Sequence, residues 1–190
     1  HSITVELVDN SHAALATPVS VTSTFTTYQT QTLPIAEPFD YTATETLGSQ
    51  EAWTNYFSGD DALVNSGSLS YEGLVGTGNS ISLDGIGKDP VINFTPATTG
   101  VVYASFMLKV TALDAAAKNG YFGILRNEDG DYISRLWISP IDSNSYRIGI
   151  TGGGALTQIF EPTTDYVLDE TIFVVFNFDL DNNTVSAWIN

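Results

Sequence analysis

The sequence predicts an all-β sandwich of two antiparallel sheets, and three features of the chain indicate it. Apolar and polar residues alternate with period two over long stretches, as in strands that bury one face. Turn-forming residues separate these stretches about every 8–12 residues, a spacing typical of sandwiches and barrels. Only residues 112–118 favour a helix, and this helix would have one or two turns at most.

Two stretches show the alternation most clearly and define the expected core. In residues 101–110 the inward set is Val102, Ala104, Phe106 and Leu108. In residues 171–180 the inward set is Ile172, Val174, Phe176 and Phe178. Further runs are expected as strands, at residues 3–8, 19–25, 68–71, 80–83, 91–94, 121–126, 132–138, 146–151 and 185–189.

Composition limits the classes of function. The 190 residues are 43% hydrophobic, enough to fill a core between two sheets, and such a chain is not expected to be disordered. With 22 acidic and 6 basic residues the formal charge is −16, which disfavours nucleic acid and anionic membranes as partners and favours divalent cations. The chain has no cysteine, which fits a bacterial exported protein at least as well as a cytosolic one. No stretch approaches the roughly 20 apolar residues of a membrane span.

The chain divides into three expected regions. Residues 1–27 contain two strands joined by a loop, and residues 28–36 are a polar linker rich in Thr and Gln. Residues 37–190 form the main sandwich, whose last strands are expected to be missing because the chain stops within or just after a strand. The start, which lacks the basic and hydrophobic regions of a signal peptide and begins with His1, is expected to be that of a processed or excised piece.

Several motifs resemble one known family. They include Glu-Pro-Phe-Asp-Tyr at 37–41, Gly-Asn-Ser-Ile-Ser-Leu at 78–83 and the stretches 66–74, 102–106, 173–179 and 183–190. In these motifs the chain resembles the laminin-G-like branch of the concanavalin-type jelly rolls, found in large secreted bacterial proteins. Residues 1–27 look like the tail of an immunoglobulin-like module, which such proteins often carry upstream.

The resemblance covers about four fifths of the chain. It implies a curved two-sheet jelly roll that is exported and often bound to calcium, with a final strand that is expected to be absent here. It also implies a role in sugar binding, in adhesion or in spacing between domains. Its motifs specify a scaffold and leave the ligand open.

No catalytic residues are expected. Glucanases on this scaffold place Glu-x-Asp-x-x-Glu or a near variant on one strand, and this chain has no such run. Asp179 and Asp181 alternate correctly but belong to a turn signal, while His1 and His12 are the only histidines. A polysaccharide lyase that uses Tyr and Arg stays open as an alternative.

Two loops have spacing that suits a structural calcium ion. Their oxygen-bearing residues alternate, so that several oxygens converge on one hard cation. The candidate ligands are Asn127, Asp129 and Asp131 in one loop and Asp179, Asp181 and Asn183 in the other. The alternative is that both loops are ordinary hairpin turns, which favour the same residue types.

A candidate ligand-binding patch comes from the scarce basic residues. Arg126, Arg135 and Arg147 lie on three consecutive expected strands, and period two places Arg135 on the same face as Ile133 and Trp137. Guanidinium groups beside an indole ring suit a sugar, especially an acidic one. The alternative is that the arginines pair with acidic side chains and that Trp137 is part of the core.

Two further tryptophans leave their roles open. Trp53 lies in an aromatic cluster near an expected loop, as either a sugar platform or a plug over the end of the sandwich. Trp188 fits either face of its strand.

These observations lead to one functional hypothesis and two alternatives. We expect a non-catalytic carbohydrate-binding or adhesive module of a secreted or cell-surface bacterial protein. Its expected partners are a polysaccharide or surface glycan and other domains of the same parent protein, with no nucleic acid and no membrane insertion. The alternatives are a structural spacer domain, or part of a glycan-active enzyme such as a glycosidase or polysaccharide lyase.

Overall fold

The regular structure of the chain is almost entirely β. The computed structural model describes residues 2–13, 15–17, 19–24, 29–113, 120–152, 159–160 and 164–190. Within these residues a 3-10 turn at Leu47–Ser49 is the one helical element, and strands make up the rest of the regular structure. No helix in the described part of the chain has the length and apolarity needed to cross a membrane.

The larger sheet is antiparallel. It contains β10 (Gly120–Arg126), β11 (Tyr132–Pro140), β12 (Ser145–Gly152), β13 (Ile159–Phe160) and β14 (Tyr166–Val167). Strands β10, β11 and β12 follow one another as a meander, and both short strands pair with β12.

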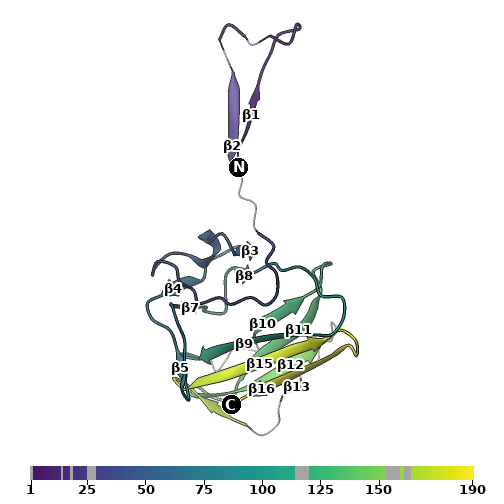
Figure 1. The fold of residues 1–190 in the computed structure, drawn as a ribbon. Helices are drawn as coiled ribbons and strands as arrows, with labels where there is room; N and C mark the ends of the chain where they lie inside the picture. Colours follow the sequence, from purple (N-terminus) through teal and green to yellow (C-terminus); the bar gives the residue numbers. More distant parts are fainter. Residues whose placement is uncertain are drawn as a thin grey trace.

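The second sheet has the order β16–β15–β9 and is also antiparallel. Its strands are β9 (Val101–Lys109), β15 (Thr171–Asp179) and β16 (Thr184–Ile189). Figure 1 shows this sheet in front of the larger one, so the two form a sandwich-like pair of layers.

The core lies between the two sheets, and both inward sets are where the period-two pattern predicts them. Leu136 and Ile148 of the larger sheet and Val174 of the second sheet are at most 1% exposed. The predicted set of β15 is buried and that of β9 packs partly buried against the same cluster. Phe106 meets the rings of Phe122 and Phe176 edge-on, at centroid distances of 6.0 and 6.2 Å. The all-β prediction is therefore confirmed.

Three short ribbons precede the sandwich in the chain. They pair β3 (Thr54–Tyr56) with β8 (Asp89–Val91), β4 (Leu63–Asn65) with β7 (Ser80–Ser82), and β5 (Ser70–Tyr71) with β6 (Leu74–Val75). The β5–β6 ribbon reaches the second sheet, where the Tyr71 ring stacks on Phe173 with centroids 6.4 Å apart.

A separate ribbon occupies the N-terminal region. It pairs β1 (Ser2–Glu6) with β2 (Ser20–Thr24) and stands apart from the other strands in Figure 1. The expected linker at 28–36 is attached to the rest of the chain, because Gln31 forms a parallel bridge with Phe94 and the Gln29 side chain donates to Glu51. The Gln31 amide donates to Asn93 and its carbonyl accepts from Thr95, at 2.8 and 2.9 Å.

The structure differs from the sequence patterns at several places besides the short strands β3, β4, β6 and β14, which no run predicts. An extra residue in β11 shifts its register against β10, so Ile133 packs against the core and does not share a face with Trp137, as period two predicts. The strand expected at 91–94 is β8, which ends at Val91. The helix expected at 112–118 lies outside the described part from residue 114 onward, and Ala112 and Leu113 are not helical.

Candidate functional site

Arginine and aromatic side chains alternate on the outer side of β10 and β11, the side turned away from the core. The Arg135 guanidinium carbon lies 5.4 Å from the Tyr132 ring centroid and 5.3 Å from that of Trp137. Tyr121, the cross-strand partner of Trp137, meets the rings of Trp137 and Tyr132 edge-on at 5.5 and 5.8 Å. Arg126, opposite Tyr132 in the ladder, lies 5.2 Å from the same Tyr132 ring. We call these five residues the arginine–aromatic face.

The middle of this face is buried. Arg135 and Trp137 are each 8% exposed, although Trp137 does not belong to the apolar cluster between the sheets. The indole nitrogen of Trp137 donates a 2.5 Å hydrogen bond to the hydroxyl of Thr151, and its cross-strand neighbour on β12 is Gly149. Both side chains therefore present little surface to a ligand in this conformation.

The accessible end of the face lies where β10 meets the β3–β8 ribbon. The Arg126 guanidinium lies 4.4 Å from the centroid of the Tyr56 ring, so the rings of Tyr56 and Tyr132 both contact it. Its Nε donates to the carbonyl of Gly130 at 3.0 Å, and its terminal nitrogens have no hydrogen-bond partner among the described residues. Tyr56 is 42% exposed and Tyr121 is 38% exposed.

The Asp89 carboxyl lies near Arg126 at this end. Asp89 is the cross-strand partner of Tyr56 in the β3–β8 ribbon. Burial raises the pKa of the Asp89 carboxyl, and the positive charge of Arg126 opposes that rise. The accessible end thus combines one cation, one anion and exposed phenol rings.

Tyr121 is held in its neutral form. Burial is the largest cause of its raised pKa, followed by the hydrogen bond with Tyr132, while the Arg135 charge acts in the opposite direction. The phenol is therefore suited to hydrogen bonding and stacking at neutral pH.

Arg147 lies further along the same side of the sheet, in a surface ion pair. Its cross-strand partner is Ser139, two residues beyond Trp137, which places its side chain on the outer side. Its Nε is 2.6 Å from the carboxylate of Asp165. Both side chains are well exposed, so the pair adds little to stability. No contact in the described structure joins Arg147 to the arginine–aromatic face.

Trp53 belongs to a different cluster. Its ring stacks on Phe39 with centroids 5.9 Å apart, and its indole nitrogen donates to the Glu37 carboxylate at 3.0 Å. The Tyr41 hydroxyl donates to the same carboxylate at 2.7 Å. Burial, and then Glu37, raise the pKa of Tyr41 to about 12. These contacts engage the Trp53 ring and indole nitrogen in packing, and both interpretations of Trp53 stay predictions.

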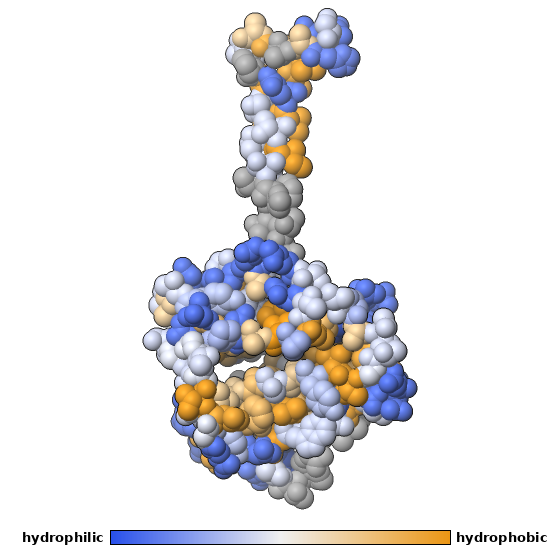
Figure 2. Space-filling view, in the orientation of Figure 1, coloured by the Kyte–Doolittle hydropathy of each residue, from blue (hydrophilic) through white to orange (hydrophobic). Residues whose placement is uncertain are grey.

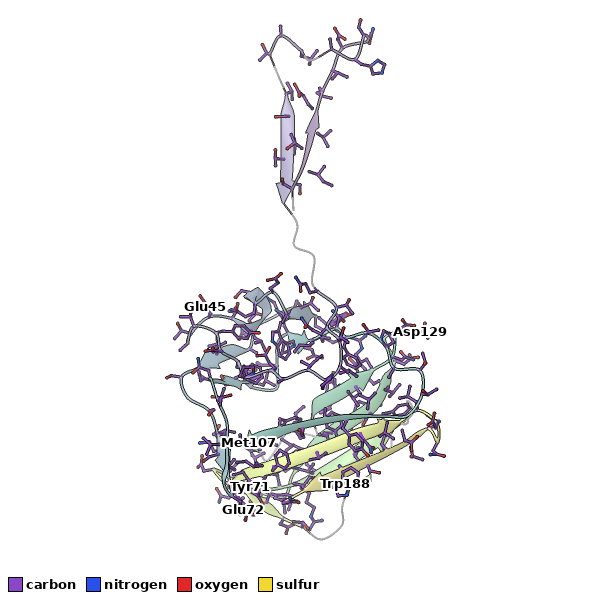
Figure 3. The ribbon with its side chains drawn as sticks, in the orientation of Figure 1. Glu45, Tyr71, Glu72, Met107, Asp129 and Trp188 are labelled. Atoms are coloured by element: carbon purple, nitrogen blue, oxygen red, sulfur yellow. The ribbon has the colours of Figure 1, made fainter. Side chains whose placement is uncertain are left out.

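The loop at residues 127–131 uses its oxygens within the turn. The Asn127 side-chain oxygen accepts from the Asp131 amide at 2.7 Å, and the Asn127 amide nitrogen contacts the Asp131 carboxylate at 3.3 Å. Gly130 supplies the positive φ of 86° that the turn requires. Asp129 lies between them at the tip (Figure 3). The contacts are those of hairpin turn chemistry.

The loop at residues 179–183 behaves in the same way. The Asp179 carboxylate accepts from the amides of Asp181 and Asn182 at 3.0 Å each and from the Asn182 side chain at 2.9 Å. The Asn182 hydrogen bonds are the largest cause of the lowered pKa of Asp179. Asp181 accepts from the amide of Gly100, and Asn183 has a φ of 53°.

Neither loop brings three acidic or histidine ligands together. Across the described residues there is no group of three or more His, Cys, Asp or Glu side chains placed to hold a metal ion. A structural calcium ion stays a prediction.

Several members of the candidate site were not anticipated from the sequence. Tyr121 and Tyr132 were expected only as strand residues, yet their positions opposite Trp137 and Arg126 follow once the strands are paired. Tyr56 and Asp89 come from a short ribbon about 40 to 70 residues away from Arg126, and no local pattern in the chain signals that approach.

Comparison of the chain with protein-family models, curated proteins and solved structures gives no match.

Proposed function

We propose that this chain is a non-catalytic carbohydrate-binding or adhesive module of a secreted or cell-surface bacterial protein. The observation that carries the proposal is the Arg126 guanidinium in contact with the rings of Tyr56 and Tyr132, with terminal nitrogens that have no hydrogen-bond partner among the described residues. Such a planar donor beside exposed phenol rings matches a sugar that carries a carboxylate or sulfate. In this arrangement the sugar ring stacks on a phenol ring, and the guanidinium binds the carboxylate or sulfate of the sugar through two parallel hydrogen bonds.

The net charge restricts an acidic ligand to short-range contacts. A molecule of charge −16 repels a polyanion at long range, so binding depends on short contacts with Arg126. A hydrogen bond to a charged group contributes about 1.5–3 kcal/mol, and a shallow surface leaves much of the sugar in water. The expected affinity of one module is therefore about micromolar to millimolar, and tandem copies raise it through avidity.

The fold we propose for this module is a concanavalin-type jelly roll. Two observations support it: the sheets pack face to face, and the chain crosses between them twice, from β9 to β10 and from β14 to β15. We also propose that the parent protein carries further domains and that a calcium ion stabilises the sandwich.

The experiment is affinity electrophoresis through gels that contain alginate, pectate or chondroitin sulfate. Arg126→Ala removes the charge and the hydrogen bonds, and should weaken retardation about 10- to 100-fold. Lys109→Ala, at an exposed residue of β9, makes the same change in net charge and should leave retardation unaltered. Arg126→Lys keeps the charge but loses the planar donor pair, so it should also weaken binding.

The outcomes separate the proposal from its alternatives. Equal retardation of wild type and Arg126→Ala would show that the site is wrong. If no acidic polysaccharide retards the wild type, the proposal that this face binds a glycan is contradicted.

A spacer domain is the second candidate function. The burial of Arg135 and Trp137 favours it, because both side chains then act in packing. A glycan-active enzyme has less support. A lyase of this kind uses a deprotonated tyrosine as its base, and the raised pKa of Tyr121 disfavours deprotonation.

A further inference from the structure

A second aromatic pair lies on the opposite side of the sandwich, on the outer face of β16–β15–β9. Tyr103 of β9 and Trp188 of β16 are 59% and 50% exposed. Their ring centroids are 6.4 Å apart with planes inclined by 31°, although the strands that carry them are separated by β15. The two rings therefore lean toward each other over β15 and form one open surface.

The orientation of both rings follows from the strand pattern. The neighbours of Tyr103 along β9, Val102 and Ala104, pack against the core, as do Ala187 and Ile189 on either side of Trp188. Because successive side chains of a strand alternate between faces, Tyr103 and Trp188 point outward. Figure 3 labels Trp188 on this sheet, and its partner on β15, Val175, lies midway along that strand.

The directly adjacent residues on the outer face are uncharged. In the register of the sheet they are Ser105, Val175, Asn177 and Ser186, and the nearest carboxylate in that register is Asp179, diagonal to Tyr103. In Figure 2 the strongly hydrophilic residues gather toward the margins of this face, and apolar and weakly polar residues fill its middle. The β5–β6 ribbon reaches the next outer position of β15, where Tyr71 stacks on Phe173.

We propose that Tyr103 and Trp188 form a stacking platform for a neutral polysaccharide. The apolar faces of pyranose rings stack on aromatic rings, and the hydroxyl groups of Ser105 and Ser186 are suitable partners for sugar hydroxyl groups, whereas Asn177 is 6% exposed and accepts from the Ser186 amide. With no basic group in the pair's register and a net charge of −16, an anionic glycan would be repelled. This site is separate from the arginine–aromatic face and does not depend on it.

Affinity electrophoresis tests the platform with hydroxyethylcellulose, galactomannan and soluble starch in the gel. We expect at least one of these polymers to retard the wild type, and expect Trp188→Ala and Tyr103→Ala each to weaken retardation about tenfold or more. Phe57→Ala is the matched control, because Phe57 is an aromatic side chain that is 69% exposed at another place on the surface. Circular dichroism melting of each variant checks that it folds, and Trp188→Phe serves as a milder change that keeps a ring.

Three results would overturn the platform. In the first, none of the neutral polymers retards the wild type. In the second, both alanine variants are retarded as strongly as the wild type. In the third, light scattering finds a dimer that Trp188→Ala abolishes. The last result would make this face an interface between copies of the chain. Arg126→Ala should leave retardation by neutral polymers intact, so the two sites fail or succeed separately.

Discussion

Tyr146 lies against Tyr166 in the larger sheet, with ring centroids 5.8 Å apart and planes inclined by 32°. The two residues face each other across the β12–β14 pairing. Tyr146 is fully buried, and among the described residues its hydroxyl has no hydrogen-bond partner. A buried hydroxyl without a partner loses the hydrogen bonds that it makes to water in the unfolded chain.

Tyr146→Phe should therefore change the free energy of unfolding at neutral pH by less than about 1 kcal/mol, or raise it slightly. At high pH the effect is larger. Burial, and then the charge of Glu170, raise the pKa of Tyr146 from 10.0 to about 12. The folded state then holds the proton that the unfolded state loses, so wild-type stability falls as the pH rises from 10.0 to about 12.

Urea unfolding between pH 9 and 12 measures this dependence. Tyr146→Phe should make the alkaline fall shallower by about 2–3 kcal/mol, and Tyr41, with its own raised pKa, accounts for part of what remains. Tyr103→Phe changes an exposed side chain and is the control. An identical alkaline fall in wild type and Tyr146→Phe contradicts the prediction.

Leu136 and Leu74 give a test of the core. Leu136 is fully buried between the sheets, whereas Leu74 of β6 is 49% exposed. Leu136→Ala should lower the free energy of unfolding by about 2–5 kcal/mol because it leaves a cavity. Leu74→Ala should change it by about 0.5 kcal/mol or less. Equal effects in urea denaturation would mean that the sheets do not pack as described.

Alanine substitutions at Gly87 and Gly85 distinguish a steric clash from backbone strain. Both have positive φ, of 103° and 83°, so alanine is strained at either position. A Cβ on Gly87 would lie 2.5 Å from the carbonyl oxygen of Asp60, which accepts the Lys88 amide, whereas one on Gly85 meets nothing within 4 Å. Gly85→Ala should cost about 1 kcal/mol of unfolding free energy and Gly87→Ala about 3 kcal/mol. Thermal melts that rank the two variants in the other order would refute the close contact.

Calcium is tested by thermal melting in chelator and in millimolar calcium. An ion that binds only the folded chain raises the melting temperature by mass action, and the chelator reverses the change. Asp179→Asn and Asp129→Asn should reduce the effect if either loop holds the ion. Superimposable melting curves in the two conditions would contradict the prediction.

The architecture of the sandwich could be predicted because alternation is a local property of the chain. Val174 and Phe176 face the core as their spacing requires, and the same spacing places Val102 and Phe106. The very short ribbons could not be predicted in this way. β6 has two residues, and a stretch of that length is too short to show alternation of apolar and polar residues.

The candidate site was predicted less completely. The period-two alternation of a strand predicts that Arg135 and Trp137 share a face, and in the structure the two side chains are in contact. Their burial depends on tertiary packing, which the alternation does not predict. Ile133 left the expected face because of the irregularity in β11. Tyr56 reached Arg126 through a long-range contact between separate elements, which no spacing in the sequence encodes.

The β1–β2 ribbon has a consequence for amide hydrogen exchange. Ile3, Val5 and Val21 are 57%, 64% and 69% exposed, and the ribbon is held by its own ladder. Two strands alone are marginal in water, so this ladder opens without the sandwich opening. Its amide protons should exchange with deuterium long before that of Val174, whose exchange waits for global unfolding. Isotope uptake in residues 2–24 therefore measures the ribbon alone, while the unfolding free energy of the whole chain is set by the two sheets.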